Sequence, residues 1–275
     1  MPGASLKLYI SCRWCAVFYC GTCGFSYDDW AGIYYPQGLP RNNWLSYYAQ
    51  EFNALELNST YYALPGLEAI ESLARKTGEG FLFSVKANQE MTHKRGQGAD
   101  ACKAFIRMLQ PLIGVNKLGC ILAQFPYSFG YTPANRQYLD QFQEWMRGLP
   151  LVIEYRNAAW LNQETLNWMK RNNIGFCCVD EPPLPRLLPP VAEVTSDIGY
   201  VRFHGRNAAK WWQHEQAWER YDYTYKQEEL EEWIPRIGQV SRTAKNTFIF
   251  TNNHWRGQAV DTIRQVRSML DQLVL

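Results

Sequence analysis

Long hydrophobic runs are missing from this sequence. No apolar stretch approaches the roughly 20 residues that a helix needs to cross a bilayer, and the charged Lys7 and Arg13 interrupt the apolar N-terminal segment. A secretory signal has an uninterrupted apolar core, so the beginning of the chain does not resemble one. We therefore expect a soluble, cytoplasmic protein without a membrane partner.

Strong charge and flexible linkers are missing as well. The 28 Lys and Arg residues exceed the 26 Asp and Glu residues by only two. This balance does not require nucleic acid as a partner, although a local basic cleft would allow it. No Ser/Gly-rich stretch or block of like charge divides the 275 residues. We expect an N-terminal extension over residues 1–15 and one domain over 16–275, long enough for a substantial core; the oligomeric state stays open.

Histidine is scarce, and the cysteines do not follow a metal-binding pattern. Four histidines argue against a site with three zinc ions. Cys12, Cys15, Cys20 and Cys23 have the spacing C-x2-C-x4-C-x2-C, which lacks the longer central segment of a zinc ribbon. A strand over residues 16–22 would also point Cys20 and Cys23 to opposite faces. We predict buried thiols or an incidental disulfide here and no cofactor, with a divalent metal elsewhere left open.

The sequence does contain eight short apolar runs, each ending in a polar or charged side chain. They cover residues 16–22, 54–58, 81–87, 118–124, 151–155, 175–179, 200–204 and 247–251. Strands that alternate with helices pair in parallel, and eight such strands can close into a barrel. We therefore predict an α/β fold, the (β/α)8 TIM barrel. An open doubly wound sheet is the alternative, but Gly21-Thr22-Cys23-Gly24 is not the Gly-rich turn that it would require.

Helical periodicity fills most of the segments between these runs. Helices are expected over residues 42–52, 66–76, 99–113, 133–147, 163–171, 226–240 and 258–270. The segment after the sixth run contains Pro182, Pro183, Pro185, Pro189 and Pro190. A proline lacks the backbone donor and clashes with the preceding helical turn, so the sixth helix is predicted to be short or irregular.

The ends of the predicted strands carry the candidate functional residues. The C-terminal ends of barrel strands lie on one face, where TIM barrels have their active sites. Candidate substrate-binding residues at this face are Asn58, Lys86, His93, Gln124, Arg156, Arg202, Asn252 and Asn253. Cations outnumber carboxylates among the outermost of these residues, which favours an anionic ligand.

Two further expectations concern the same face. The last helix begins near Gly257, where its N-terminus would suit a phosphate group. Conversely, Glu154 with Arg156 and Glu56 with Lys86 could form buried ion pairs that only fill the barrel. Burying so many polar groups without a ligand or water is unfavourable, so for the whole set we favour a binding site.

Three classes of function remain open. The first is an enzyme acting on a phosphate- or carboxylate-bearing small molecule, with His204, Asp180 and Glu154 as acid–base residues. The second is a divalent-metal-dependent barrel resembling endonuclease IV or xylose isomerase, whose ligands would be Glu56, Glu154, Asp180 and His204. The third is a binding protein without chemistry, in which loop aromatics capture nucleic acid or glycan. We favour the first class.

Several motifs occur in an order that is typical of one family. They include residues 21–30, Glu56-Leu57-Asn58, residues 83–86, Gln124-Phe125-Pro126, Glu154-Tyr155-Arg156-Asn157, Asp180-Glu181-Pro182, residues 201–205 and Asn252-Asn253. From about residue 16 to the C-terminus the chain resembles the YecE-like proteins, a family classed as domain of unknown function number 72. The resemblance implies a TIM barrel and no particular activity. Residues 1–15 and Cys20 depart from the family pattern, so the resemblance does not support a cysteine cluster.

Overall fold

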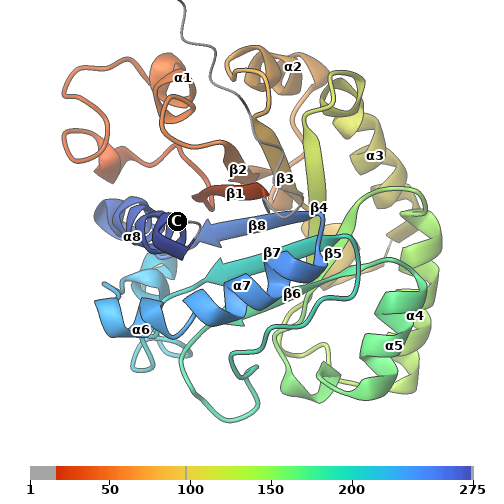
Figure 1. The fold of residues 1–275 in the computed structure, drawn as a ribbon. Coiled ribbons are helices and arrows are strands. Elements are labelled where there is room, and N and C mark those ends of the chain that lie inside the picture. The colour runs from red at the N-terminus through yellow and green to blue at the C-terminus, as the bar shows by residue number, and fades with distance from the viewer. Residues whose placement is uncertain (1–16, 97, 274–275) are drawn as a thin grey trace, which may run out of the picture.

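The eight strands form one parallel barrel. The computed structural model describes residues 17–96 and 98–273. Neighbouring strands pair in the order β1-β8-β7-β6-β5-β4-β3-β2, and each pair is parallel. The strands are β1 (Val17–Thr22), β2 (Ala54–Leu57), β3 (Leu82–Lys86), β4 (Leu118–Gln124), β5 (Leu151–Glu154), β6 (Gly175–Asp180), β7 (Ile198–Phe203) and β8 (Asn246–Thr251). The prediction of a (β/α)8 TIM barrel is confirmed (Figure 1).

Contacts between the first two strands close the barrel. Cys23, directly after β1, forms an isolated parallel bridge with Glu56 of β2. The backbone amide of Gly24 donates to the carbonyl oxygen of Glu56 at 2.8 Å. Only glycine fits at position 21 of this seam, because a Cβ on Gly21 would lie 2.0 Å from the carbonyl oxygen of Ala54.

Strand β6 illustrates why continuous apolar runs become barrel strands. All six of its residues are buried, as expected for a parallel strand that is covered on both faces. Successive side chains point to opposite faces. Cys177 points into the barrel, where its Sγ lies 3.8 Å from Glu154, whereas the Sγ of Cys178 lies 3.5 Å from the backbone oxygen of Glu193 on the outside.

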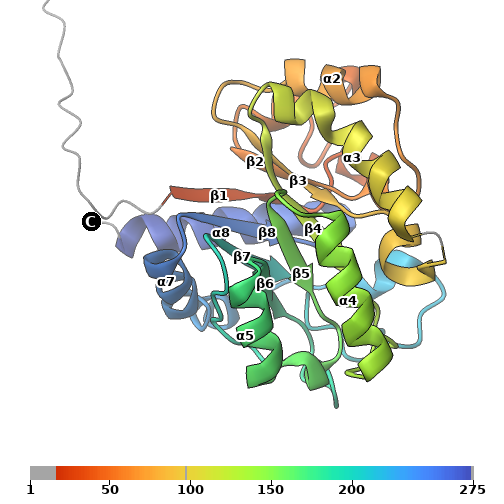
Figure 2. The same cartoon turned by 90° about the vertical axis from the view of Figure 1, so that its right-hand side faces the viewer.

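The helices lie around the outside of the strands (Figures 1 and 2). They are α1 (Trp44–Tyr48), α2 (Leu67–Arg75), α3 (Gly98–Gly114), α4 (Pro133–Trp145), α5 (Gln163–Arg171), α6 (Gln227–Glu231), α7 (Ile234–Thr243) and α8 (Gln258–Leu273). Local signals set where two of them begin. The side chain of Thr132 accepts a hydrogen bond from the Asn135 amide before α4, and Asn162 does the same for Thr165 before α5, which are N-cap contacts.

Two segments differ from the sequence prediction, and a third agrees with it. The prediction of one helix over 226–240 is wrong, because α6 ends at Glu231 and α7 begins at Ile234 with Pro235 in its first turn, where the missing backbone donor is tolerated. The segment holding His93 is a helical turn (Glu90–Lys94) rather than a loop. No helix lies between β6 and β7 in the described chain, which confirms the irregular sixth helix.

Within the described part of the chain, no helix combines the length and the apolar character that crossing a bilayer demands. The predicted extension over residues 1–15, with Cys12 and Cys15, lies outside the described residues.

Candidate active site at the barrel mouth

A cavity of about 700 Å³ opens at the C-terminal ends of the strands. Residues that follow each of the eight strands contribute to its lining. Six of the predicted substrate-binding residues line it: Asn58, Lys86, His93, Gln124, Arg156 and Asn252. Pockets of about 300–1,000 Å³ are typical of small-molecule sites, so the cavity has the size for such a ligand.

Cationic side chains line this cavity, and among the described residues only Arg156 is paired with carboxylates, those of Glu154 and Glu181 outside the lining. Its charged residues are Lys86, Arg156 and Arg220, and no Asp or Glu belongs to the lining that the structure describes. The guanidinium carbons of Arg156 and Arg220 lie 5.6 and 5.5 Å from the centroid of the Trp211 ring. An aromatic face attracts a guanidinium, so Trp211 holds both arginines at one side of the cavity.

Aromatic rings and neutral polar groups make up most of the remaining lining. The rings belong to Tyr27, Tyr61, Tyr62, Tyr127, Trp211, Trp212 and Tyr221, and the amides to Asn58, Gln124 and Asn252. Burial lowers the pKa of both His93 and His254 to about 4, so these imidazoles are neutral near pH 7. The surface can therefore stack against a planar group and hydrogen-bond a polar one.

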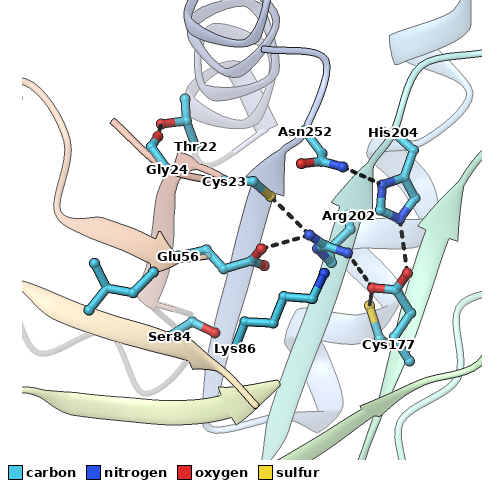
Figure 3. A network of polar contacts seen from close by, with 12 residues as sticks. Thr22, Cys23, Gly24, Glu56, Ser84, Lys86, Cys177, Arg202, His204 and Asn252 are labelled. Carbon is cyan, nitrogen blue, oxygen red and sulfur yellow. Dashed lines mark hydrogen bonds and ion pairs between the residues drawn. The ribbon is translucent and has the colours of Figure 1, made fainter. Parts of the chain in front are cut away.

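A buried polar network lies below the cavity (Figure 3). We call Glu56, Glu154, Arg202 and His204 the floor network. Arg202 Nη2 lies 2.6 Å from Glu56 Oε1, and Arg202 Nη1 donates to Glu154 Oε2. The Tyr200 hydroxyl completes the arrangement by donating to Glu56 Oε2 at 2.6 Å. Each carboxylate of the network thus receives donors from within the barrel.

The position of Arg202 differs from the role that the sequence predicted for it. Its side chain is 1% exposed and is not part of the cavity lining. Its guanidinium donates to two carboxylates and also lies 3.3 Å from the Sγ of Cys23. Burial alone would raise the pKa of Glu154, but Arg156, Arg202 and His204 together hold it well below its usual value. Arg202 and Glu154 therefore form a buried ion pair, not an open anion site.

His204 is fully buried and held in one tautomer. Its Nε2 lies 3.2 Å from Glu154 Oε1, and its Nδ1 lies 3.1 Å from Asn252 Nδ2 and 3.5 Å from Arg156 Nη2. A guanidinium only donates and an ionised carboxylate only accepts, so Nε2 carries the proton. Burial, with Arg156, lowers the pKa of His204 well below its usual value. The neutral ring orients Asn252 from beneath the cavity and does not line it.

Glu181 neighbours Arg156 of the cavity and was not among the site residues predicted from the sequence. Arg156 Nε lies 2.5 Å from Glu154 Oε1, and Arg156 Nη1 donates to Glu181 Oε2 at 3.1 Å. The other oxygen of Glu181 accepts the backbone amide of Leu188 at 3.0 Å. Burial raises the pKa of Glu181 to about 7, against the opposing effect of Arg156. Its place in the Asp180-Glu181-Pro182 motif was the available signal.

Asp180 lies apart from the cavity that it was predicted to serve. Its carboxylate accepts from Arg206 Nε at 3.0 Å, from the Tyr225 hydroxyl at 2.5 Å and from Trp233 Nε1 at 2.6 Å. Arg206 and Tyr225 anchor the β7–α6 connection to β6, and Trp233 anchors the junction of α6 and α7; none of the four residues lines the cavity. The His204 amide donates to the Asp180 carbonyl at 2.8 Å, but the Asp180 carboxylate binds other partners than the side chains of Glu154 and His204.

Asn253 and Gly257 also lie outside the cavity lining. The side-chain amide of Asn253 donates to the Tyr223 carbonyl and to Thr262 Oγ1, both at 2.9 Å. Just before α8, the Arg256 amide donates to Asp29 Oδ2 at 2.6 Å. A side-chain carboxylate thus occupies the place expected for a phosphate.

The predicted metal ligands do not form a metal site. Glu56 and Glu154 are bound by Arg202, and the donors named above surround Asp180. Over residues 17–96 and 98–273, no three His, Cys, Asp or Glu side chains gather in a way that could hold a metal ion. The predicted set fails because arginines occupy the positions where a cation would bind.

Burial raises the pKa of the Cys20 thiol to about 12.

Lys86 lines the cavity and does not form the ion pair with Glu56 that was the alternative interpretation; Glu56 pairs with Arg202. Its Nζ lies 4.8 Å from the centroid of the Tyr61 ring. Burial and the neighbouring charge of Arg202 lower the pKa of Lys86. The lysine is therefore a cation of the cavity without a structural ion pair in the described chain.

Arg220 and Tyr221 come from the long β7–α6 connection, where sequence periodicity gave no guidance. Burial would raise the pKa of Tyr221, but Arg156, Lys86 and Arg220 bring it below its usual value of 10.0. The aromatic richness of this segment was the only signal, and it did not distinguish the rings that face the cavity. We call Lys86, Arg156, Arg220 and Tyr221 the cationic wall.

Comparison with known proteins gives consistent matches along the chain. The family model described as "Protein of unknown function DUF72" matches residues 19–274. The UPF0759 protein YunF of Bacillus subtilis is 32% identical over 93% of this chain and 95% of its own length. YecE of Escherichia coli K12 is 24% identical over 72% of this chain and 75% of its own.

Solved structures agree with the barrel. A DUF72 family protein from Thermotoga maritima superposes with a TM-score of 0.85 at 38% identity, over 92% of this chain and 99% of that one. One from Enterococcus faecalis gives 0.82 at 28% identity, over 93% and 96% of the two chains.

Proposed function

Because the chain belongs to the DUF72 family, whose description names no activity, we propose its function from the cavity: an enzyme that acts on an anionic small molecule. The substrate carries a phosphate or carboxylate group and binds at the C-terminal face of the barrel. One observation carries the proposal, namely that Lys86, Arg156 and Arg220 line the cavity without an Asp or Glu in the described lining. Arg156 is already paired with Glu154 and Glu181, so an anion would neutralise the charge of Lys86 and Arg220 and accept charge-assisted hydrogen bonds from the wall.

The residues of the wall and floor take different parts in this proposal. Arg156 and Arg220 hold the anion, and aromatic rings of the lining contact the rest of the substrate. Tyr221 is the proposed acid–base residue, because a phenol with a lowered pKa can exchange a proton nearer neutral pH. Glu154 and His204 act as positioning residues, since both are buried beneath the cavity. Asp180 has no part in the reaction.

The dimensions of the cavity favour a small ligand over a polymer. A volume of about 700 Å³ lies within the roughly 300–1,000 Å³ of small-molecule pockets. A nucleic-acid groove would instead need a basic surface that follows several phosphates. The aromatic lining therefore supports recognition of a ring or planar group on one bound molecule.

Titration with an anion tests the proposal. Inorganic pyrophosphate should bind the purified protein in calorimetry, and Arg220→Gln should weaken binding roughly tenfold, which corresponds to about 1.4 kcal/mol. Arg136→Gln is the matched control, because Arg136 pairs with Glu164 on the surface and does not line the cavity. An absence of binding, or equal effects of the two substitutions, would contradict an anion site at the wall.

A further inference from the structure

Lys86 differs from the two arginines of the cationic wall. Arg156 pairs with Glu154 and Glu181, and Arg220 lies over the Trp211 ring. Among the described residues, the Lys86 Nζ has neither an ion pair within 4.0 Å nor a hydrogen bond. It borders the cavity, and its Nζ lies 4.8 Å from the centroid of the Tyr61 ring.

The surroundings of Lys86 make its ammonium form less favourable than that of a lysine in water. The side chain reaches toward the guanidinium of Arg202 (Figure 3), whose own charge is matched by Glu56 and Glu154. Both carboxylates are therefore bound by Arg202, and at longer range they only partly oppose the lowering of the Lys86 pKa. Burial, followed by the charge of Arg202, lowers the pKa of Lys86. Desolvation and a neighbouring cation are the two conditions that make a lysine nucleophilic.

We propose that Lys86 is a catalytic nucleophile that forms a Schiff base with an aldehyde or ketone carrying the anionic group. The proposal rests on the function proposed above and narrows its substrate to an anionic carbonyl compound. Arg156 and Arg220 would hold the phosphate or carboxylate, which places the carbonyl carbon within reach of the third cation of the same wall.

The step is balanced by groups on the wall. The lone pair of Nζ forms the C–N bond while the carbonyl π electrons move to oxygen, and a proton passes from nitrogen to that oxygen. Tyr221 then protonates the hydroxyl group of this carbinolamine, which leaves as water while the nitrogen lone pair forms the C=N bond. The products are an iminium on Lys86, one water molecule and the Tyr221 phenolate. No oxidant or reductant takes part.

Reductive trapping tests the proposal on the full chain. We would treat the protein with 4-carboxybenzaldehyde and cyanoborohydride and locate the adducts by peptide mass spectrometry. Lys94 is the internal control, because it is 59% exposed and pairs with Glu90 at 2.7 Å. Lys86 should be labelled several-fold faster than Lys94, because burial and the charge of Arg202 lower the pKa of Lys86 and leave more of its amine unprotonated. Labelling of Lys86 no faster than Lys94 would overturn the proposal.

Two further arms separate this proposal from the anion site. Lys86→Arg should lose the label and still bind pyrophosphate; if that variant does not fold, protection of wild-type Lys86 by pyrophosphate replaces it. Benzaldehyde lacks the carboxylate and should label Lys86 more slowly than 4-carboxybenzaldehyde. Equal rates would overturn the anion site and keep the nucleophile. Pyrophosphate binding without preferential labelling of Lys86 would overturn the nucleophile and keep the anion site.

Discussion

The floor network and the cationic wall lie next to each other but differ in whether their charged side chains have partners of opposite charge. In the floor, Arg202 pairs with both Glu56 and Glu154, and the other oxygen of Glu154 contacts His204 and Arg156. In the wall, Lys86 and Arg220 face the cavity with no carboxylate in the described lining. The two carboxylates of the floor are matched by Arg202 and by Arg156 of the wall, whereas Lys86 and Arg220 have no carboxylate partner among the described residues.

This difference separates structural residues from candidate functional ones. The polar side chains on β5 and β7 face each other across the barrel, where burial makes an unpaired charge very unfavourable. The residues that follow the strands lie one layer higher, where solvent or a ligand can satisfy them. Chemistry is therefore expected at the level of the wall, with the floor holding Arg156 and Asn252 in place.

The largest effect is expected from Arg202→Ala. Removing one partner of a buried ion pair leaves the other uncompensated and costs about 3–5 kcal/mol, here for Glu56 and Glu154 together. Urea unfolding should show this loss for Arg202→Ala and a much smaller one for Arg220→Ala, whose side chain borders the cavity. If Arg202→Ala is stable but loses its affinity for pyrophosphate, Arg202 instead belongs to the anion site of the wall.

A smaller effect is expected at Glu181, which joins the floor to the wall through Arg156. Its folded pKa of about 7 lies above the ordinary 4.5, so between these values the folded state keeps a proton that the unfolded chain has lost. Stability should thus fall as pH rises from 4.5 to 7, by on the order of 1–3 kcal/mol. The slope should flatten in Glu181→Gln.

The control for this prediction is Glu193→Gln on the same β6–β7 connection. Because His204 remains in both variants, its own pH dependence cancels when each is compared with the wild type. Parallel stability curves for wild type and Glu181→Gln between pH 4.5 and 7 would show that Glu181 is ionised in the folded protein.

The sequence predicts the barrel because its strands carry a strong local signal. The bounds of β4 and α5 agree with the expected ranges 118–124 and 163–171. The errors arise where local and tertiary preferences compete. Pro235 divides the expected helix over 226–240, although helix-favouring residues surround it.

The candidate site is predictable in outline and not in its pairings. Strand geometry places Arg156 and Arg202 near the same end of the barrel, but does not say which cation meets the carboxylates. That choice depends on distances across the barrel between β2, β5 and β7. Arg220 and Tyr221 lie on an irregular connection whose sequence has no helix or strand periodicity. Only the folded chain therefore shows that they belong to the wall.

The smallest effect on stability, and the sharpest contrast between the two regions, is expected for tyrosines. Tyr200 in the floor donates to Glu56, and burial raises its pKa well above the usual value, whereas the cations of the wall lower the pKa of Tyr221. Ultraviolet difference titration should show one phenol that ionises below pH 10.0 in the wild type and is absent in Tyr221→Phe. Tyr62→Phe, which alters an exposed tyrosine of the same lining, should keep this early transition. Unfolding free energies of both variants should stay within about 0.5 kcal/mol of the wild type. If the early transition survives in Tyr221→Phe, the phenol that ionises early is not Tyr221. Tyr221 would then not be the proton donor, and the cations of the wall would serve only to bind the anion.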